Sequence, residues 1–231
     1  SDAPDSRGLQ NFAMSLLDEG TTNRTSQQIA EEQERLGAAI SAGGSLDRST
    51  VTMSALSTNL GPSLDLLSDI VRNPAFADAE VERVRNQTLT GIAQEMKDPN
   101  GIAARMLPSL LYGASHPYAT LGGGDPEAIK RFARADLTGF KDRWLRPDNL
   151  EIFIVSDRPL SEVQAALDER FGRWEAPAVP KGIKQFAAPL ARVTSPRIVL
   201  IDRPQSPQSV IRGGQLTPVD PKSDITALTS A

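Results

Sequence analysis

The apolar run Leu150–Ser156, LEIFIVS, constrains the fold of this chain more than any other segment. Its apolar residues follow one another almost without interruption, which is typical of a strand buried on both faces or placed centrally in a sheet. Two earlier runs, Ala38–Ala42 and Thr50–Thr58, are also β-like, and Gly43-Gly44 and Asp47 supply the turn between them. The chain is therefore predicted to build a sheet from distant segments.

Helical periodicity accounts for most of the sequence around these strands. Apolar residues recur at helical spacing over Leu9–Gly20, and Ser26 is placed to N-cap a helix over Gln27–Leu36. The further predicted helices cover Leu64–Val71, Asp78–Lys97, Ile102–Leu111, a start at Asp125-Pro126, Ala135–Trp144 and Leu160–Phe171. This order of elements predicts an α+β domain, with helices packed on one face of a mostly antiparallel sheet.

The composition changes after residue 175, which predicts a domain boundary. Prolines recur through residues 176–196, as expected of a linker. The runs Arg197–Asp202 and Ser209–Arg212 read as strands of a second unit, and Ile225–Ala231 looks like a helix cut off in mid-pattern. We expect a nearly complete module over 1–175, a Pro-rich linker over 176–196 and the truncated start of the following module over 197–231, all within a fragment of a longer protein.

Composition excludes several classes of function. The 231 residues carry 25 basic and 29 acidic side chains, and the interspersed charges argue against a nucleic-acid partner. The chain has no cysteine and one histidine, so a disulfide, a thiolate site and a zinc site with several histidines are all excluded. No apolar run approaches the roughly 20 residues of a membrane-spanning helix.

Several residues invite a functional interpretation and are more simply structural. His116 lies in Ser115-His116-Pro117-Tyr118 and is expected to belong to a turn. Gly122–Gly124 lacks the preceding strand and the lysine of a phosphate-binding loop, so we expect it to lead into a helix capped by Asp125. Asp65 and Asp69 could pair as carboxylates, but their i, i+4 spacing is common on exposed helix faces.

A series of segments in a fixed order gives the chain a family resemblance. LLDEGTTNRT, QIAEEQERLGAAISA, ALSTNLGPSLDLLSDIVRNPAF, SHPYAT and RWLRPDNLEIFIVSD together resemble the pitrilysin/insulinase family of zinc metallopeptidases over roughly residues 7–175. The run RIVLIDRPQSPQSVIRGG looks like the opening of the family's next module. The resemblance implies a metallohydrolase module of the pitrilysin/mitochondrial-processing-peptidase type. Such modules pair into a clam-shell that encloses unfolded peptides.

The same resemblance implies that the catalytic residues are missing. A catalytic module carries His-x-x-Glu-His on one helix, followed by a further glutamate on a later helix. When the helix is aligned on Gly20-Thr21, the motif positions fall on Asn11, Met14 and Ser15, and the distal glutamate falls at or near Gly91. Asn11 and Ser15 are poor zinc ligands, and the Met14 thioether cannot act as a general base. Glu95 and Glu82 flank Gly91 on the same predicted helix but have no histidine partners.

The resemblance therefore identifies the chain as a non-catalytic, degenerate module of a bacterial member. The family is a zinc metalloendopeptidase family, but this chain is predicted to be inactive, without metal or cofactor, and zinc is expected only in a partner catalytic module. Its expected role is to form the chamber wall, bind extended peptide and pair with a catalytic module or subunit. The alternatives are a scaffold subunit without a proteolytic role, and a segment of a longer polypeptide whose catalytic zinc module lies elsewhere. The expected location is the periplasm or cell envelope of a Gram-negative bacterium.

Overall fold

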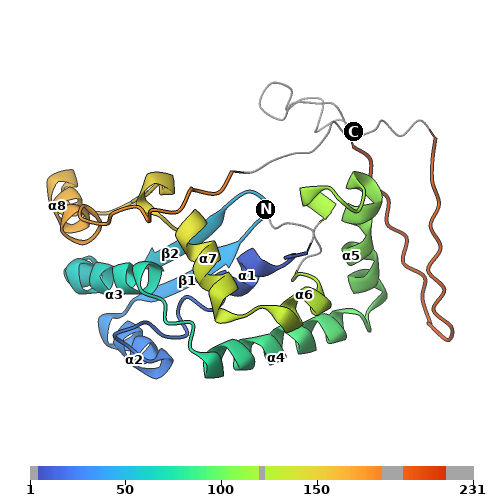
Figure 1. Ribbon diagram of the computed structural model, residues 1–231, viewed down its shortest axis with the longest axis horizontal. Helices are drawn as coiled ribbons and strands as arrows, with labels where there is room; N and C mark the ends of the chain where they lie inside the picture. Colours follow the sequence, from blue (N-terminus) through green and yellow to red (C-terminus); the bar gives the residue numbers. More distant parts are fainter. Residues whose placement is uncertain (1–4, 120–122, 184–194, 217–231) are drawn as a thin grey trace.

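The computed structural model describes residues 5–119, 123–183 and 195–216 (Figure 1). Helices and two strands follow one another along the chain in an order close to the predicted one. They are α1 (Leu9–Met14), α2 (Ser26–Leu36), β1 (Ala39–Gly44), β2 (Ser49–Ser54), η1 (Ser57–Asn59), α3 (Leu60–Arg72), α4 (Asp78–Glu95), α5 (Pro99–Tyr112), η2 (Pro117–Ala119), α6 (Pro126–Arg131), α7 (Arg134–Trp144), η3 (Pro147–Asn149) and α8 (Leu160–Phe171).

The antiparallel hairpin of β1 and β2 forms the sheet within the described residues. Its register places Ile40 opposite Met53 and Ala42 opposite Val51, and these four side chains pack on the hydrophobic core. Helices α1 and α2 contact β1 on this covered face. The α+β class with helices on one face of an antiparallel sheet is therefore confirmed. The opposite face carries small and hydroxyl-bearing residues, namely Ser41, Thr50, Thr52 and Ser54, all exposed.

Helix α1 forms the centre of the core. It lies against β1 and α7 (Figure 1). The segment from α1 to Gly20 has every large apolar side chain except Leu9 almost fully buried, at 2% exposure or less: Phe12, Ala13, Met14, Leu16 and Leu17. The predicted helix over Leu9–Gly20 is too long, because α1 ends at Met14. Beyond it the chain forms tight turns, in which the Leu16 N–H donates to the Ala13 carbonyl at 3.2 Å.

A buried carboxylate holds the loop that follows α1. Asp69 of α3 is 6% exposed and accepts hydrogen bonds from Thr21 Oγ1 at 2.7 Å, Asn23 Nδ2 at 2.7 Å, Arg24 NH1 at 2.6 Å and Asn73 Nδ2 at 2.9 Å. Burial alone would raise the pKa of Asp69, but these four donors outweigh it and lower the pKa. The Asp69 network thus joins the loop after α1 to both α3 and the turn that ends it.

The start of α2 differs by one residue from the prediction. Thr25, rather than Ser26, is the N-cap: its hydroxyl accepts from the Gln28 N–H at 3.2 Å, and Gln28 Oε1 accepts from the Thr25 N–H at 2.9 Å. This reciprocal pair is a capping box, which satisfies two backbone donors at the helix start. Gly37 ends the helix with φ 60°, as its left-handed position requires.

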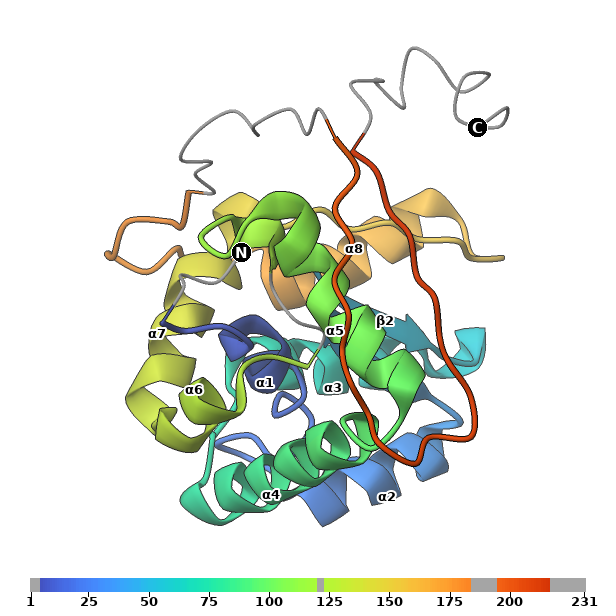
Figure 2. The same cartoon turned by 90° about the vertical axis from the view of Figure 1, so that its right-hand side faces the viewer.

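The predicted strands beyond β2 are wrong for this structure. Leu150–Ser156 forms no strand, because no other strand among the described residues pairs with it. The runs Arg197–Asp202 and Ser209–Arg212 are likewise unpaired, and Figure 2 shows them as two extended arms in front of α5. Residues 225–231, predicted as a helix cut off in mid-pattern, lie outside the described residues. So does part of the predicted linker. The division into modules at 175 and 197 stays a prediction.

We expect Asp69→Ala to lower the free energy of unfolding by about 3 kcal/mol at neutral pH, because it leaves Arg24 and three other donors without their acceptor. The lowered folded-state pKa means that the contribution of Asp69 is present above its unfolded pKa, about 4, and is lost as the pH falls through the folded-state value. Urea unfolding from pH 7 down to pH 3 should show the difference between the variant and the unmodified chain shrinking.

Asp65→Ala on the same helix, at 54% side-chain exposure, is the control and should cost less than about 1 kcal/mol. Equal losses in the two variants would contradict this role of Asp69.

Candidate functional site

The three motif positions on α1 and its C-cap point in different directions. Asn11 and Ser15 are exposed, whereas Met14 is 0% exposed inside the core. Asn11 lies against the end of β1, where a methyl group on Gly44 would come within 2.5 Å of its Oδ1 atom. The Ser15 hydroxyl donates to the Phe12 carbonyl at 3.0 Å. The structure thus brings Asn11 and Ser15 to one surface and removes Met14 from it.

This donor set does not fit a catalytic zinc ion. Zinc sites in peptidases combine imidazole and carboxylate ligands, and Asn11 and Ser15 offer a neutral amide and a hydroxyl. The single histidine of the chain, His116, cannot supply the pair of imidazoles that the inverted motif requires. No cluster of three or more histidine, aspartate or glutamate side chains with metal-binding geometry occurs among the described residues.

The distal position is equally unsuited to metal binding. Gly91 is exposed on α4 and has no side chain to offer. Glu95, one turn further along, pairs with Arg105 at 2.8 Å, and Glu82 pairs with Arg85 at 3.1 Å. Both glutamates are therefore engaged by arginines of the same helical layer.

Arg85 and Arg105 are buried polar residues that the sequence analysis missed. Arg85, 9% exposed, donates to the carbonyls of Ile129 and Phe132 and lies 5.7 Å from the centre of the Phe12 ring. Arg105, 4% exposed, donates to the Gly124 carbonyl at 2.6 Å. The two guanidinium groups hydrogen-bond to backbone carbonyls near the two ends of α6. Their role is therefore to hold α6 in place in the packed structure.

Arg85 could have been found from the sequence. Val81, Arg85 and Leu89 are spaced by four residues, so the arginine occupies an apolar stripe of a helix. A cation at such a position needs acceptors from another element, because an unpaired buried charge is costly.

The predicted structural roles of the loops agree with the geometry. The His116 ring stacks on Tyr112 with centroids 5.1 Å apart, and its Nδ1 atom accepts from the Tyr118 N–H at 3.0 Å. Asp125 caps α6 by accepting from the Glu127 N–H at 3.1 Å, as expected for the end of the glycine loop. The exposed helix face expected for Asp65 and Asp69 is found for Asp65, which binds Arg170 at 2.7 Å. It is wrong for Asp69, which is buried and holds its own network.

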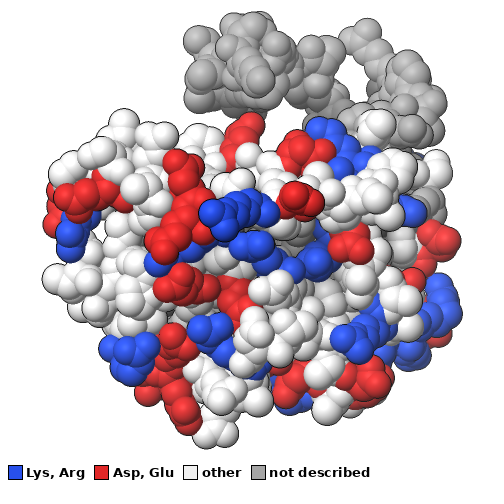
Figure 3. Space-filling model, turned by 60° about the vertical axis from the view of Figure 1, so that its left-hand side comes forward, with Lys and Arg blue, Asp and Glu red and all other residues white. Residues whose placement is uncertain are grey.

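Charges on the described surface alternate in sign. Figure 3 shows acidic and basic side chains intermingled on one face of the molecule. Ion pairs among the described residues include Arg24–Glu32 at 2.9 Å and Arg83–Glu80 at 2.7 Å. No helix among the described residues is both long and apolar enough to cross a bilayer.

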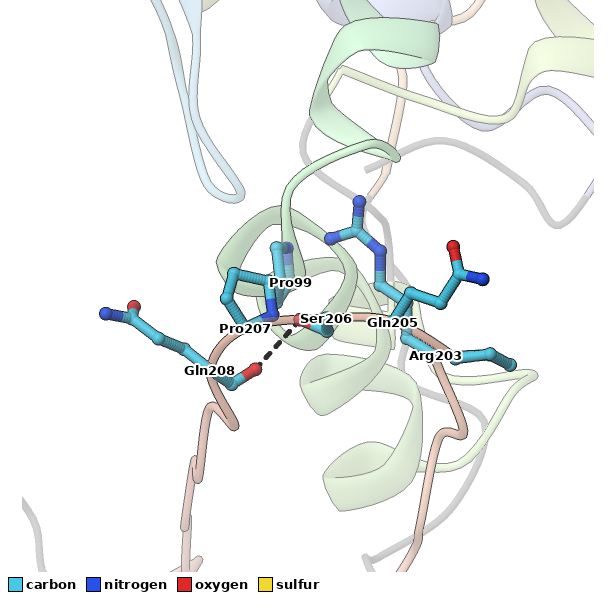
Figure 4. A pocket seen from close by; sticks show the side chains of 7 residues that line it. Pro99, Arg203, Gln205, Ser206, Pro207 and Gln208 are labelled. Carbon is cyan, nitrogen blue, oxygen red and sulfur yellow. Dashed lines mark hydrogen bonds between the residues drawn. The ribbon is translucent and has the colours of Figure 1, made fainter.

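The surface hollows lie away from the motif positions. One, of about 330 Å³, is formed by the loop Arg203–Gln208 against Pro99 at the start of α5, and in it Ser206 Oγ donates to the Gln208 carbonyl at 2.9 Å (Figure 4). Another, of about 280 Å³, lies between Ile152, Ile154 and α8. Neither hollow is lined by Asn11, Ser15 or Gly91.

Two family profiles match most of the chain. The profile "Insulinase (Peptidase family M16)" matches residues 1–122, and the profile "Peptidase M16 inactive domain" matches residues 131–228. An uncharacterized zinc protease of Mycobacterium leprae is 27% identical over 165 residues, which is 71% of this chain and 37% of that protein. Subunit 1 of the bovine mitochondrial cytochrome b-c1 complex is 27% identical over 136 residues, 59% of this chain and 28% of that subunit.

Solved structures agree with these matches. The peptidase M16 inactive domain from Pseudomonas fluorescens superposes with a TM-score of 0.71 at 26% identity, covering 79% of this chain and 44% of that one. The periplasmic protease PqqL from Escherichia coli has the same fold, with a TM-score of 0.71 at 18% identity over 83% of this chain and 22% of that one. The chain thus spans less than half the length of these relatives.

Burial predicts how the motif positions respond to a carboxylate. Met14→Glu should lower the free energy of unfolding by about 3 kcal/mol or more, because it places a charge where no partner is present. Ser15→Glu, the matched control at the adjacent exposed position, should cost less than about 1 kcal/mol. Chemical denaturation followed by circular dichroism measures both. A tolerated glutamate at Met14 would contradict the packing described for α1.

Proposed function

Because the chain belongs to the insulinase family of peptidases, family M16, we propose that it is a non-catalytic module of such an enzyme. The observation that carries this proposal is which residues occupy the three motif positions of α1 and its C-cap. Met14 is part of the core, and Asn11 and Ser15 offer no imidazole or carboxylate. A module of this kind has the fold of the peptidase without the donors for its metal.

The proposed role is to form one wall of a peptide-binding chamber. Zinc would then be held by a catalytic module that pairs with this one, either in a separate subunit or elsewhere on a longer polypeptide. The match to the inactive-domain profile supports this division of roles. So does the length of the relatives, since each of them contains more polypeptide than this chain does.

The hairpin offers a candidate edge for an extended peptide. On β1 the Ile40 N–H already donates to Gln33 Oε1 of α2 at 2.7 Å, so this edge is partly occupied. The outer edge of β2 carries no further strand among the described residues. Between the two edges predicted from the sequence, we therefore favour the Thr50–Thr58 side for peptide addition, in which main-chain hydrogen bonds supply affinity.

The scaffold alternative has an observation of its own. The similarity to subunit 1 of the cytochrome b-c1 complex relates the chain to a named component of a respiratory assembly. The proposed envelope location is supported by the likeness of fold to periplasmic PqqL. Co-purification and the full-length reading frame together separate the two roles: an intact His-x-x-Glu-His motif in a co-purifying sibling or elsewhere on the same polypeptide supports the peptidase assembly, and its absence from both supports the scaffold.

The purified chain is expected to bind far less than one zinc ion per molecule and to leave unfolded casein uncleaved, because the motif positions lack ligands. Elemental analysis after incubation with zinc and washing, together with a casein digestion assay, measures both. A catalytic relative with the intact motif serves as the positive control. Stoichiometric zinc together with cleavage that a chelator abolishes would overturn the proposal.

A further inference from the structure

Asn100 and Gly101, at the start of α5, are the one Asn-Gly pair in the sequence. In such a pair the glycine has no side chain to shield its backbone nitrogen, so this nitrogen can approach the carbonyl carbon of the asparagine side chain. Asn100 is exposed, and its side-chain amide has no hydrogen-bond partner within the part of the chain that the structure describes. Water therefore reaches the amide, and no neighbouring side chain holds it in place.

The fold requires glycine at position 101. The turn between α4 and α5 is tight, because the Asp98 N–H donates to the Glu95 carbonyl at 3.1 Å. A methyl group on Gly101 would collide with the oxygen of that same carbonyl. A side chain that would shield the Gly101 nitrogen is therefore excluded by the turn itself.

Asp98 restrains the Gly101 nitrogen. It is the N-cap of α5, and its Oδ2 atom accepts from the Gly101 N–H at 3.1 Å, while Pro99 occupies the first helical position. The first N–H groups of a helix have no intrahelical acceptor, so the carboxylate is what holds this one. The Gly101 nitrogen can reach the Asn100 side chain only after it leaves Asp98. The first turn of α5 must therefore open locally before the two groups react.

We propose that Asn100 is a site of spontaneous deamidation and that the Asp98 cap sets its rate. The Gly101 nitrogen bonds to the Asn100 Cγ atom, and the side-chain amide nitrogen leaves as ammonia with the proton that Gly101 gives up. This closes a cyclic succinimide. Water then opens the ring at either carbonyl and leaves aspartate or isoaspartate at position 100. Water is the only co-reactant, and no electrons are transferred to or from the protein.

Both products disturb the start of α5. Aspartate adds a second carboxylate beside that of Asp98, and isoaspartate lengthens the main chain within the tight turn. The helix that begins there carries Arg105, which is 4% exposed, binds Glu95 at 2.8 Å and donates to the Gly124 carbonyl at 2.6 Å. Deamidation therefore weakens the contact between α5 and the residue that leads into α6.

Incubation of the full 231-residue chain at neutral pH measures the reaction, with peptide mass spectrometry and an isoaspartate-specific methyltransferase as readouts. Asn100 should lose its amide first. Asn86 is the internal reference: it is exposed in the middle of α4, is followed by glutamine and should stay intact. Asp98→Ala should raise the rate at Asn100 about fivefold, which corresponds to the roughly 1 kcal/mol that an N-cap contributes.

Two further variants separate the cap from general stability. Asp98→Ser keeps a side-chain acceptor at the N-cap and should hold the rate at Asn100 within about twofold of that of the unmodified chain. Asp136→Ala is the matched control, because it removes the carboxylate that accepts from the Ala133 N–H at 2.8 Å at the start of α7. It should leave the rate at Asn100 unchanged. Circular dichroism before incubation verifies that each variant folds.

Faster loss of the amide at Asn100 than at Asn86, with acceleration by Asp98→Ala alone, supports the proposal. Equal rates at the two asparagines in the unmodified chain overturn it, whatever the variants do. An unchanged rate in folded Asp98→Ala overturns the role of the cap. Equal acceleration by Asp136→Ala also overturns that role, because the reaction would then follow unfolding of the whole module.

Discussion

The carboxylate of Asp69 fixes the loop that leads from α1 to α2. Chain reversal after α1 brings Thr21, Asn23 and Arg24 onto α3, and Asp69 is the acceptor that all three share. Arg24 also binds Glu32 of α2 at 2.9 Å, so one cation in the loop after α1 links α2 and α3. Four donors around one buried carboxylate leave little freedom for the loop, and the apolar side chains of α1 are held in the core as a result.

The core explains how the fold is retained when metal ligands are missing. In this module α1 and the turn after it contribute through Phe12, Met14 and Leu17, which belong to the hydrophobic core. Buried apolar area contributes about 25 cal/mol per Å² and does not require a metal. The positions that face outward, Asn11 and Ser15, are free to vary without loss of this packing. The core side chains that stabilise the fold therefore lie on one face of this short helix, and Asn11 and Ser15, where zinc ligands are proposed to be missing, lie on another.

Local patterns were sufficient for most helices and for the hairpin. Alternation over Val51 and Met53 predicted β2, and Gly37 predicted the end of α2. The predicted turn at Gly43-Gly44 is wrong, because both glycines belong to β1 and pair with Thr50 and Ser49. Leu150–Ser156 shows the limit of such patterns, because β-propensity describes a fit to neighbouring strands that the segment itself does not contain. Asp69 shows the same limit for polar residues. Its i, i+4 relation to Asp65 suggested an exposed helix face, whereas three of its four partners come from a loop 45 or more residues away.

The burial of Met14 limits which substitutions this helix tolerates. Histidines placed at Asn11 and Ser15 would still leave the helix without a general base, and a glutamate placed at Met14 would enter an apolar core. A carboxylate at position 14 would need compensating substitutions among the core neighbours of Met14. The packing of one methionine thus ties any acidic group at this position to the composition of the surrounding core.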